Sequence, residues 1–359
     1  MSAQPYTQDL DGPAGTTDTE SPATGGEGAS RSGCAGVGRA FGTFGELLQG
    51  VLPGTGEHFM VTSPVAAWST ATFAWEPDAG TVQVAPAHKR KAARLAQRAL
   101  RAAGRPGGGQ LRIGSELPEG KGMASSSADL VATARAVADA IGTRFTPADI
   151  ENLLRDIEPT DGVMYDEIVA FSHREVRLRE RLGTVPAMTV IAYDEGGTVD
   201  TISYNHAAGT RTEAETHEYA RLLDQAREAI RDSDLHSLGR VATRSAELNA
   251  RHNPRPSLPA LRRICRDIDG LGIACAHSGT MLGILLPHDD PDTALKADLA
   301  LGACASLPGT TMVYRSLGHR DDWSYGGLRS PEGAGSAGDL RPLRPFRPFA
   351  PGYAPATTA

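Results

Sequence analysis

Apolar residues recur at helical spacing in several parts of the chain. After residue 129 they recur three, four and seven positions apart, which predicts a helix with one apolar face that begins near Ser125 and ends at Gly142. Similar spacing predicts helices over residues 89–103, 150–157, 213–231, 235–250 and 258–268. Thr146 and Pro147 provide an N-cap and a first turn for the second of these.

Runs of apolar and β-branched residues predict the strands. They occur at residues 59–65, 67–75, 81–85, 110–114, 186–193 and 199–204, and Glu195-Gly196-Gly197 lies between the last two as a hairpin turn. Strands followed by a helix, a strand and a further helix indicate an α+β fold. At 359 residues and 40% hydrophobic content, the chain can form one large domain or two ordinary ones.

Composition separates two tails from the rest. Residues 1–37 are rich in small, polar and acidic residues, and residues 326–359 are rich in proline and arginine, so both are predicted to be mobile. A net charge of −7 implies no general affinity for nucleic acid. The four cysteines form no Cys-x-x-Cys pair and are interpreted as reduced thiols. No apolar run reaches membrane-spanning length, so a cytoplasmic protein is expected.

The segment before the 125–141 helix combines glycines, a lysine and three serines. Gly120 and Gly122 let the backbone approach an anion, and the first N–H groups of the helix favour negative charge. Ser125 to Ser127 can cap the helix or face a metal ion or phosphate oxygen. The common P-loop is disfavoured, because Gly114 lies one residue too far from Gly120-Lys121. An ordinary capped helix after a glycine turn is the simpler alternative.

The same segment resembles the nucleotide loop of the GHMP kinases, which include galactokinase, homoserine kinase and mevalonate kinase. The resemblance rests on Pro118, Gly120, Gly122, Met123, Ala124, Ser125, Ser126, Ser127 and Ala128, and Gly-Lys-Gly-Met-Ala-Ser-Ser is similar to the L-threonine kinases of cobalamin side-chain synthesis. It implies a two-domain α+β fold, with an N-terminal nucleotide-binding domain with a mixed sheet (38–182) and a C-terminal α+β domain (183–325). It also implies that residues 118 and 120–127 bind ATP.

Two further segments resemble motifs of the same family. Residues 42–50 are similar to the first motif, which contributes to the substrate pocket and points to Glu46 and Gln49 rather than to Glu57. Residues 272–286 are similar to the third motif, which implies active-site roles for His277, Ser278, Gly279 and Thr280, with His277 as a structural group rather than a base. Ser245 and Asn249 lie four apart on one predicted helix face. A Ser-Ala-x-x-Asn segment lies near the acceptor pocket in the resembled family, which implies that these two residues are acceptor ligands; plain polar surface positions are the alternative.

Asp161 is the candidate for aligning the acceptor hydroxyl and taking its proton. From the residues alone, a carboxylate beside Pro159-Thr160 and Gly162 is either a capping device or a positioned base. The resemblance favours the base, although homoserine kinases manage without one; Asp166 and Glu167 are weaker candidates. Lys121 would add positive charge near the nucleotide or point to solvent.

The resemblance implies a small-molecule kinase. It would transfer the γ-phosphoryl group of ATP to a hydroxyl group, most simply that of L-threonine, with Mg²⁺ held by Ser126 or Ser127 and an acidic group. Another hydroxylated metabolite, such as homoserine, serine or an amino alcohol, is the first alternative. A non-catalytic ligand sensor on the same fold is the second. Neither nucleic acid nor membrane is expected as a partner, and a homodimer is compatible with the sequence.

Overall fold

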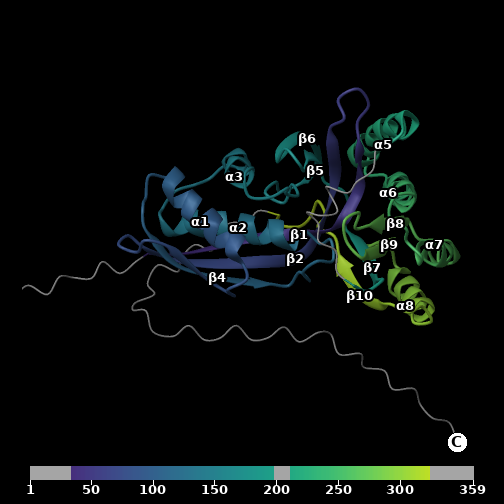
Figure 1. The fold of residues 1–359 in the computed structure, drawn as a ribbon. Coiled ribbons are helices and arrows are strands. Elements are labelled where there is room, and N and C mark those ends of the chain that lie inside the picture. Colours follow the sequence, from purple (N-terminus) through teal and green to yellow (C-terminus); the bar gives the residue numbers. More distant parts are fainter. Residues whose placement is uncertain (1–33, 198–210, 324–359) are drawn as a thin grey trace, which may run out of the picture. The chain divides into compact units, whose positions relative to one another are not determined.

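The computed structural model describes residues 34–197 and 211–323 (Figure 1). The strands are β1 (Ala35–Val51), β2 (His58–Glu76), β3 (Val82–Ala85), β4 (Gly108–Ser115), β5 (Ile168–Ser172), β6 (Arg177–Gly183), β7 (Met188–Asp194), β8 (Gly272–Cys275), β9 (Met281–Pro287) and β10 (Thr310–Arg315). The helices are α1 (Arg90–Ala102), α2 (Ser125–Ala140), α3 (Pro147–Leu154), α5 (Glu213–Arg231), α6 (Leu235–Ala250), α7 (Leu258–Asp267) and α8 (Thr293–Cys304).

The strands join in one mixed sheet with the order β10-β7-β9-β8-β1-β2-β4-β3, and the β5–β6 hairpin attaches to β2. The β3–β4 pair is parallel, and the other pairs are antiparallel. Helices α1 and α2 lie against the β1-β2-β4 part with α3 beside them, and α6 to α8 lie against the β7-β8-β9 part (Figure 1). Helix α5 packs on α6, β1 and β6. The predicted α+β class with a mixed sheet is confirmed.

Helix α2 lies directly against β1, and two glycines make this close approach possible. A Cβ built at Gly36 would lie less than 3.0 Å from backbone atoms of Ala136 and Ala140, and one at Gly38 would meet Ala132 in the same way. Twelve of the sixteen residues of α2 are buried, so it is enclosed on more sides than the predicted single apolar face. The strand therefore holds the middle and the C-terminal half of α2 close against the sheet.

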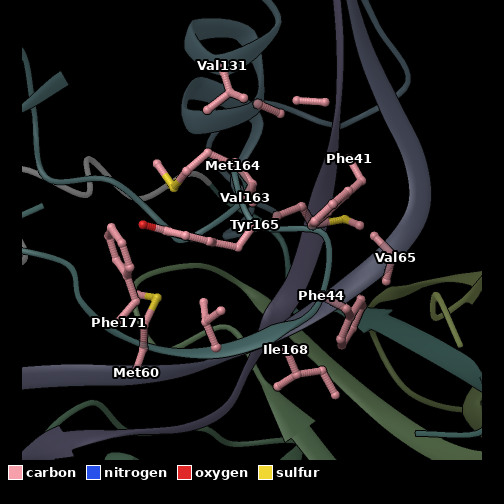
Figure 2. Close-up of a cluster of buried hydrophobic side chains, with 14 of the residues drawn as sticks. Phe41, Phe44, Met60, Val65, Val131, Val163, Met164, Tyr165, Ile168 and Phe171 are labelled. Atoms are coloured by element: carbon pink, nitrogen blue, oxygen red, sulfur yellow. The ribbon is translucent and has the colours of Figure 1, made fainter. Parts of the chain in front are cut away.

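A buried apolar cluster supports the segment that follows Asp161. Figure 2 shows Val163, Met164 and Tyr165 beside Phe171 of β5 and Met60 of β2. All five side chains are at most 4% exposed. The Tyr165 hydroxyl donates to Glu151 of α3 at 2.7 Å. Because this packing fixes the chain on the C-terminal side of Asp161, the carboxylate has little freedom to move.

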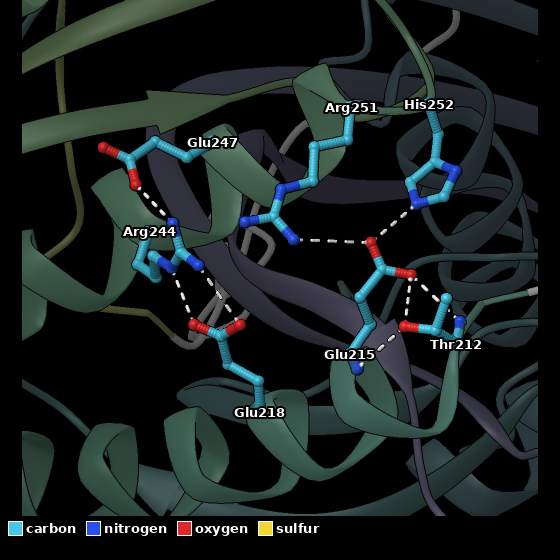
Figure 3. Close-up of polar contacts among 7 residues, drawn as sticks. All are labelled: Thr212, Glu215, Glu218, Arg244, Glu247, Arg251 and His252. Atoms are coloured by element: carbon cyan, nitrogen blue, oxygen red, sulfur yellow. Dashed lines mark hydrogen bonds and ion pairs between the residues drawn. The ribbon is translucent and has the colours of Figure 1, made fainter.

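Ion pairs between α5 and α6 orient the second helix. Arg244 of α6 donates to Glu218 of α5 at 2.7 Å and to Glu247 at 2.8 Å (Figure 3). The next residue, Ser245, and Asn249 one turn later are buried, at 0% and 2% exposed. The two candidate ligands therefore share an inward face, and the surface alternative for them is wrong.

The predicted helices are present within one or two residues of the expected bounds, except that α3 begins and ends three residues earlier than the expected 150–157. Helix α8, strands β1, β8, β9 and β10 and the β5–β6 hairpin were not predicted, and residues 58–76 form one long strand instead of two. Strand β1 begins at Ala35, inside the predicted N-terminal tail. The rest of that tail, the expected strand 199–204 and the C-terminal tail lie outside the described residues. Within the described ranges, no helix has the length and apolarity needed to cross a membrane.

Candidate active site

A cavity of about 570 Å³ lies where the segments singled out in the sequence converge. Its wall is formed by residues of the loop before α2, the first turn of α2, the start of α1, the loop between α3 and β5, and strand β1. Of the candidate residues, those that line it are Glu46, Gln49, Gly120, Gly122, Met123, Ala124, Ser125, Ser126, Ser127, Asp161 and Ser278. Pro118, Lys121, Ser245, Asn249, His277, Gly279 and Thr280 do not.

The loop before α2 has the backbone expected of an anion cradle. Gly120, Gly122 and Ala124 have φ values of 70°, 82° and 55°, in the left-handed region, and Ala124 is the N-cap of the helix. The expectation that a serine caps the helix is wrong, because the N-cap makes no side-chain hydrogen bond. The hydroxyls of Ser126 and Ser127 instead bond to carboxylates, so the helix start stays open to an anion.

Backbone hydrogen bonds join this loop to the two other motifs. The N–H of Thr43 donates to Met123 O at 3.2 Å, and that of Gly45 donates to Gly122 O at 3.1 Å. From the other side, the N–H of Thr280 donates to Lys121 O at 3.3 Å. Three segments that lie far apart in the sequence therefore shape one loop.

Ser126 faces an acidic group that the sequence analysis did not identify. Its hydroxyl donates to Glu158 Oε1, and Lys91 Nζ forms an ion pair with Glu158 Oε2. Glu158 is 9% exposed and lines the cavity. The pair of a hydroxyl and a carboxylate in the cavity wall offers the oxygen ligands that Mg²⁺ prefers. The only signal in the sequence was the position of Glu158, three residues before Asp161.

Asp161 is held by Ser127 on the cavity wall. The Ser127 hydroxyl donates to Asp161 Oδ2 at 3.0 Å and accepts from the Asp161 N–H at 3.1 Å. Burial and the negative charge of Glu46 raise the pKa of Asp161 to about 7, despite the hydrogen bond from Ser127. A carboxyl group with a pKa near neutrality can accept a proton at working pH.

Glu46 anchors a chain of buried polar side chains that leads away from the cavity. His277 donates from its backbone N–H to Glu46 Oε2 at 3.1 Å, and its Nδ1 lies 2.7 Å from the same oxygen. His277 Nε2 lies 2.9 Å from Ser245 Oγ, which also accepts from the Gln49 N–H at 3.2 Å. The imidazole thus orients Glu46, and Ser245 Oγ holds the other nitrogen of the imidazole ring.

Asn249 is directed to Cys275, its Nδ2 lying 3.6 Å from the sulfur. Glu57, the alternative to Glu46, bonds to Ser172 and to Arg179 at 2.7 Å and does not line the cavity. Asp166 pairs with Arg135 and Glu167 with Arg181, both outside the cavity wall. Of the acidic candidates named from the sequence, Glu46 and Asp161 are the ones in the cavity.

Comparison with known proteins agrees with this geometry. The model of the GHMP kinases N terminal domain matches residues 89–172, which include the loop before α2 (called the phosphate loop below) and Asp161. The GHMP kinases C terminal model matches residues 226–301, which include Ser245 and the His277 segment. The chain belongs to the GHMP kinase superfamily. It is therefore a phosphotransferase, and ATP is the co-substrate of this family.

Individual GHMP kinases cover most of the chain. The L-threonine kinase of Citrobacter freundii is 27% identical over 251 residues, which is 69% of this chain and 85% of that protein. The L-threonine kinase of Salmonella typhimurium is 27% identical over 258 residues, with 71% and 85% covered. The crystal structure of homoserine kinase from Cytophaga hutchinsonii superposes with a TM-score of 0.62 at 14% identity, over 80% of this chain and 96% of that chain. The last likeness shows the fold alone.

In this GHMP kinase the side chain of Lys121 points away from the anion cradle formed by the loop before α2, contrary to expectation. Its ammonium lies 2.7 Å from Asp194 Oδ2 at the end of β7 and donates to Gly197 O at 2.6 Å. Thr280 Oγ1 donates to the other oxygen of Asp194 at 2.5 Å. The buried carboxylate attracts the lysine away from the cavity, so the side chain ties the phosphate loop to β7.

We expect Lys121→Met to act on stability more than on turnover. The change leaves Asp194 buried with one strong partner fewer, which costs about 1–3 kcal/mol of unfolding free energy. Burial raises the pKa of Asp194, but the hydrogen bonds from Lys121 and Thr280 hold it below its ordinary value. Thermal unfolding and steady-state kinetics check this. A loss of kcat beyond about 100-fold in a normally stable variant would restore Lys121 to the chemistry.

The start of α1 contributes basic side chains to the cavity wall. Lys89 Nζ lies 2.5 Å from Asp129 of α2 and 2.5 Å from Glu119, and its side chain is 13% exposed. Asp129 also accepts from Ser69 of β2 at 2.5 Å. Residues 89–91 thus bring three basic side chains to the cavity wall beside the loop before α2, where Lys89 and Lys91 balance the neighbouring carboxylates.

Proposed function

We propose that this kinase transfers the γ-phosphoryl group of ATP to the hydroxyl group of a small amino acid, with L-threonine as the first candidate. The observation that carries the proposal is one continuous cavity with an anion cradle and Lys89 to Lys91 along part of its wall, and with Asp161 and Glu46 along another part. Phosphoryl transfer needs such positioning and charge neutralisation more than covalent help from the protein.

The nucleotide would bind at the loop before α2. Backbone N–H groups from Gly120 to Ser126 would hold its phosphates, and the dipole of α2 would favour their charge. The donor set on the cavity wall fits Mg²⁺, because the Ser126 hydroxyl and the Glu158 carboxylate are adjacent hard oxygens. Ser127 is already engaged with Asp161 on both its donor and acceptor sides, so Ser126 is the better ligand. Bound Mg²⁺ would neutralise charge on the phosphates.

Asp161 would align the acceptor hydroxyl. The hydroxyl oxygen forms the new bond to the γ-phosphorus, and the bond between the γ-phosphorus and the β,γ-bridging oxygen breaks, so that ADP leaves. The hydroxyl proton passes to the Asp161 carboxylate. Ser127 holds that carboxylate in place, and Glu46 raises its proton affinity.

We expect Glu158→Gln to raise the Mg²⁺ concentration needed for half-maximal activity by about tenfold or more, because an amide oxygen carries no negative charge. The measurement is a Mg²⁺ titration of initial rates at saturating ATP. Glu57→Gln is the matched control, since Glu57 is an ion-paired glutamate outside the cavity. An unchanged Mg²⁺ dependence in Glu158→Gln would remove Glu158 from the metal site.

L-Threonine is favoured by the two relatives that carry its name at 27% identity. L-Homoserine is the second candidate, because homoserine kinases share the fold. The test is ATP consumption with Mg²⁺ across L-threonine, L-serine, L-homoserine and simple amino alcohols, with the product identified by mass. Phosphothreonine as the preferred product supports the proposal in full. ATP binding without turnover of any acceptor contradicts it and favours the non-catalytic sensor.

A further inference from the structure

Two side chains on the cavity wall, the half-buried Gln49 and the buried His173, carry buried polar atoms that lack a partner. Gln49 Oε1 and both ring nitrogens of His173 make no hydrogen bond to any residue the structure describes. His173 is 3% exposed. An unpaired buried polar atom costs folding free energy, so such atoms in a cavity wall point to a ligand that pairs with them. His173 was not among the residues singled out in the sequence.

Both side chains lie in the part of the cavity wall that carries Glu46 and Asp161, which we call the acceptor end. Gln49 lies on β1 three residues after Glu46 and opposite Met60 of β2, which also lines the cavity. His173 follows β5, and its carbonyl accepts from the N–H of Thr160 at 3.1 Å, next to Asp161. The two residues are therefore tied to the segments that carry Glu46 and Asp161.

The acceptors of this end are Gln49 Oε1, the carboxylates of Glu46 and Asp161, and the lone pair of the His173 ring. The donors on the same side chains, the Gln49 amide and the His173 ring N–H, carry no positive charge. Burial lowers the pKa of His173 to about 3, so the ring is neutral at working pH and offers a lone pair without positive charge. Apart from this ring, the basic side chains in the described wall of the cavity all come from residues 88–91, beside the phosphate loop. An excess of acceptors and negative charge matches a ligand group with several N–H donors and a positive charge.

We propose that Gln49 and His173 recognise a primary ammonium group on the acceptor. The inference rests on the proposed function and deepens it: the acceptor class is hydroxyl compounds with a free amine, and the amine is the group that selects them. Binding the ammonium pairs Gln49 Oε1 and the lone-pair nitrogen of the neutral His173 ring, whereas an acceptor without the amine leaves these two acceptors buried and unpaired.

The experiment compares acceptors that differ in the amine alone. Initial rates are measured on the full chain with Mg²⁺ and ATP for L-threonine against 3-hydroxybutanoate, and for L-homoserine against 4-hydroxybutanoate. For each amino acid that is phosphorylated, we expect the amine-free partner to lose about 100-fold or more in kcat/KM. This comparison uses the unmodified protein and does not depend on how any variant folds.

Two variants then assign the effect to residues. Gln49→Met removes the orphaned oxygen at similar volume, and His173→Phe removes both ring nitrogens. Each should raise the KM for the amino acid by about 10- to 100-fold, leave the KM for ATP unchanged, and barely affect the amine-free acceptor. His58→Phe is the matched control, because His58 packs its ring against His173 at 6.1 Å but does not line the cavity.

The outcomes separate this inference from the function on which it rests. Equal kcat/KM for the acceptors with and without an amine overturns the inference and leaves the kinase assignment intact. Equal losses for both acceptors in Gln49→Met and His173→Phe also overturn it, since they would show a purely structural role. No phosphorylation of any acceptor overturns the proposed function and the inference together.

Discussion

Asp161→Asn should lower kcat by about 10²- to 10⁴-fold, the range that general base catalysis contributes. The amide keeps the size of the side chain and a carbonyl oxygen that can accept from Ser127, but it cannot take the proton of the acceptor hydroxyl. ATP affinity should change less than about twofold, because the proposed role of the Asp161 carboxylate is toward the acceptor hydroxyl, whereas backbone N–H groups would bind the phosphates. Rapid-quench kinetics and a nucleotide-binding titration measure the two quantities separately.

The pH dependence gives a second readout of the same residue. The pKa of Asp161 is raised to about 7 by burial and by Glu46, so the carboxylate that acts as base accumulates as the pH rises from 6 to 8. The kcat/KM of the wild-type enzyme should rise over this window, and that of the residual Asn activity should not. The free energy of unfolding should instead fall as the pH rises from about 4 to about 7, because the native state binds the Asp161 proton more tightly than the unfolded chain does. At pH 8 the Asn variant should therefore melt at the same temperature as the wild type or higher.

Asp166→Asn is the matched control, since Asp166 is a nearby aspartate that pairs with Arg135 outside the cavity wall. It should retain nearly full turnover. An Asp161→Asn enzyme with unchanged kcat would show that the acceptor loses its proton without a base from the protein, as the resemblance to homoserine kinases allows.

Gly279→Ala should disrupt the phosphate loop. A Cβ at this position would lie less than 3.0 Å from Lys121 O, Lys121 C and the Cα of Gly122, all of them backbone atoms. The loop cannot move away without losing the hydrogen bond from the Thr280 N–H to Lys121 O and the contacts with Thr43 and Gly45. We expect kcat/KM for ATP to fall by about 100-fold or more, because a displacement of about 1 Å is enough for such a loss.

Gly302→Ala provides the control for this substitution. Gly302 lies within α8, and a Cβ there meets nothing within 4 Å. Alanine should leave activity unchanged and add up to about 1 kcal/mol of stability, because glycine is unfavourable inside a helix. Full activity in Gly279→Ala would show that the loop and the 276–280 segment do not depend on close contact. Differential scanning fluorimetry and ATP-dependent kinetics on both variants decide the matter.

The sequence alone determined the elements whose signals are local. The helices have apolar spacing and end signals such as Thr146-Pro147, and both are properties of neighbouring residues. The glycines at 120 and 122 similarly indicated the turn before α2, because φ values of 70° at Gly120 and 82° at Gly122 favour that residue type. Helix α8 escaped prediction because most of its apolar side chains are not buried, Leu295 being 61% exposed.

Only the tertiary structure decided which side chains pair with one another across long sequence distances. Glu46 and His277 are 231 residues apart, and nothing near Glu46 in the sequence reveals the imidazole that orients it. Glu158 is a candidate metal ligand because Ser126 donates a hydrogen bond to it. The ammonium of Lys121 lies outside the cavity because it pairs with Asp194. His173 stands out only where burial leaves its nitrogens without partners. Such choices depend on which side chains meet, and that is settled by the packing of the whole fold rather than by the pattern of any one segment.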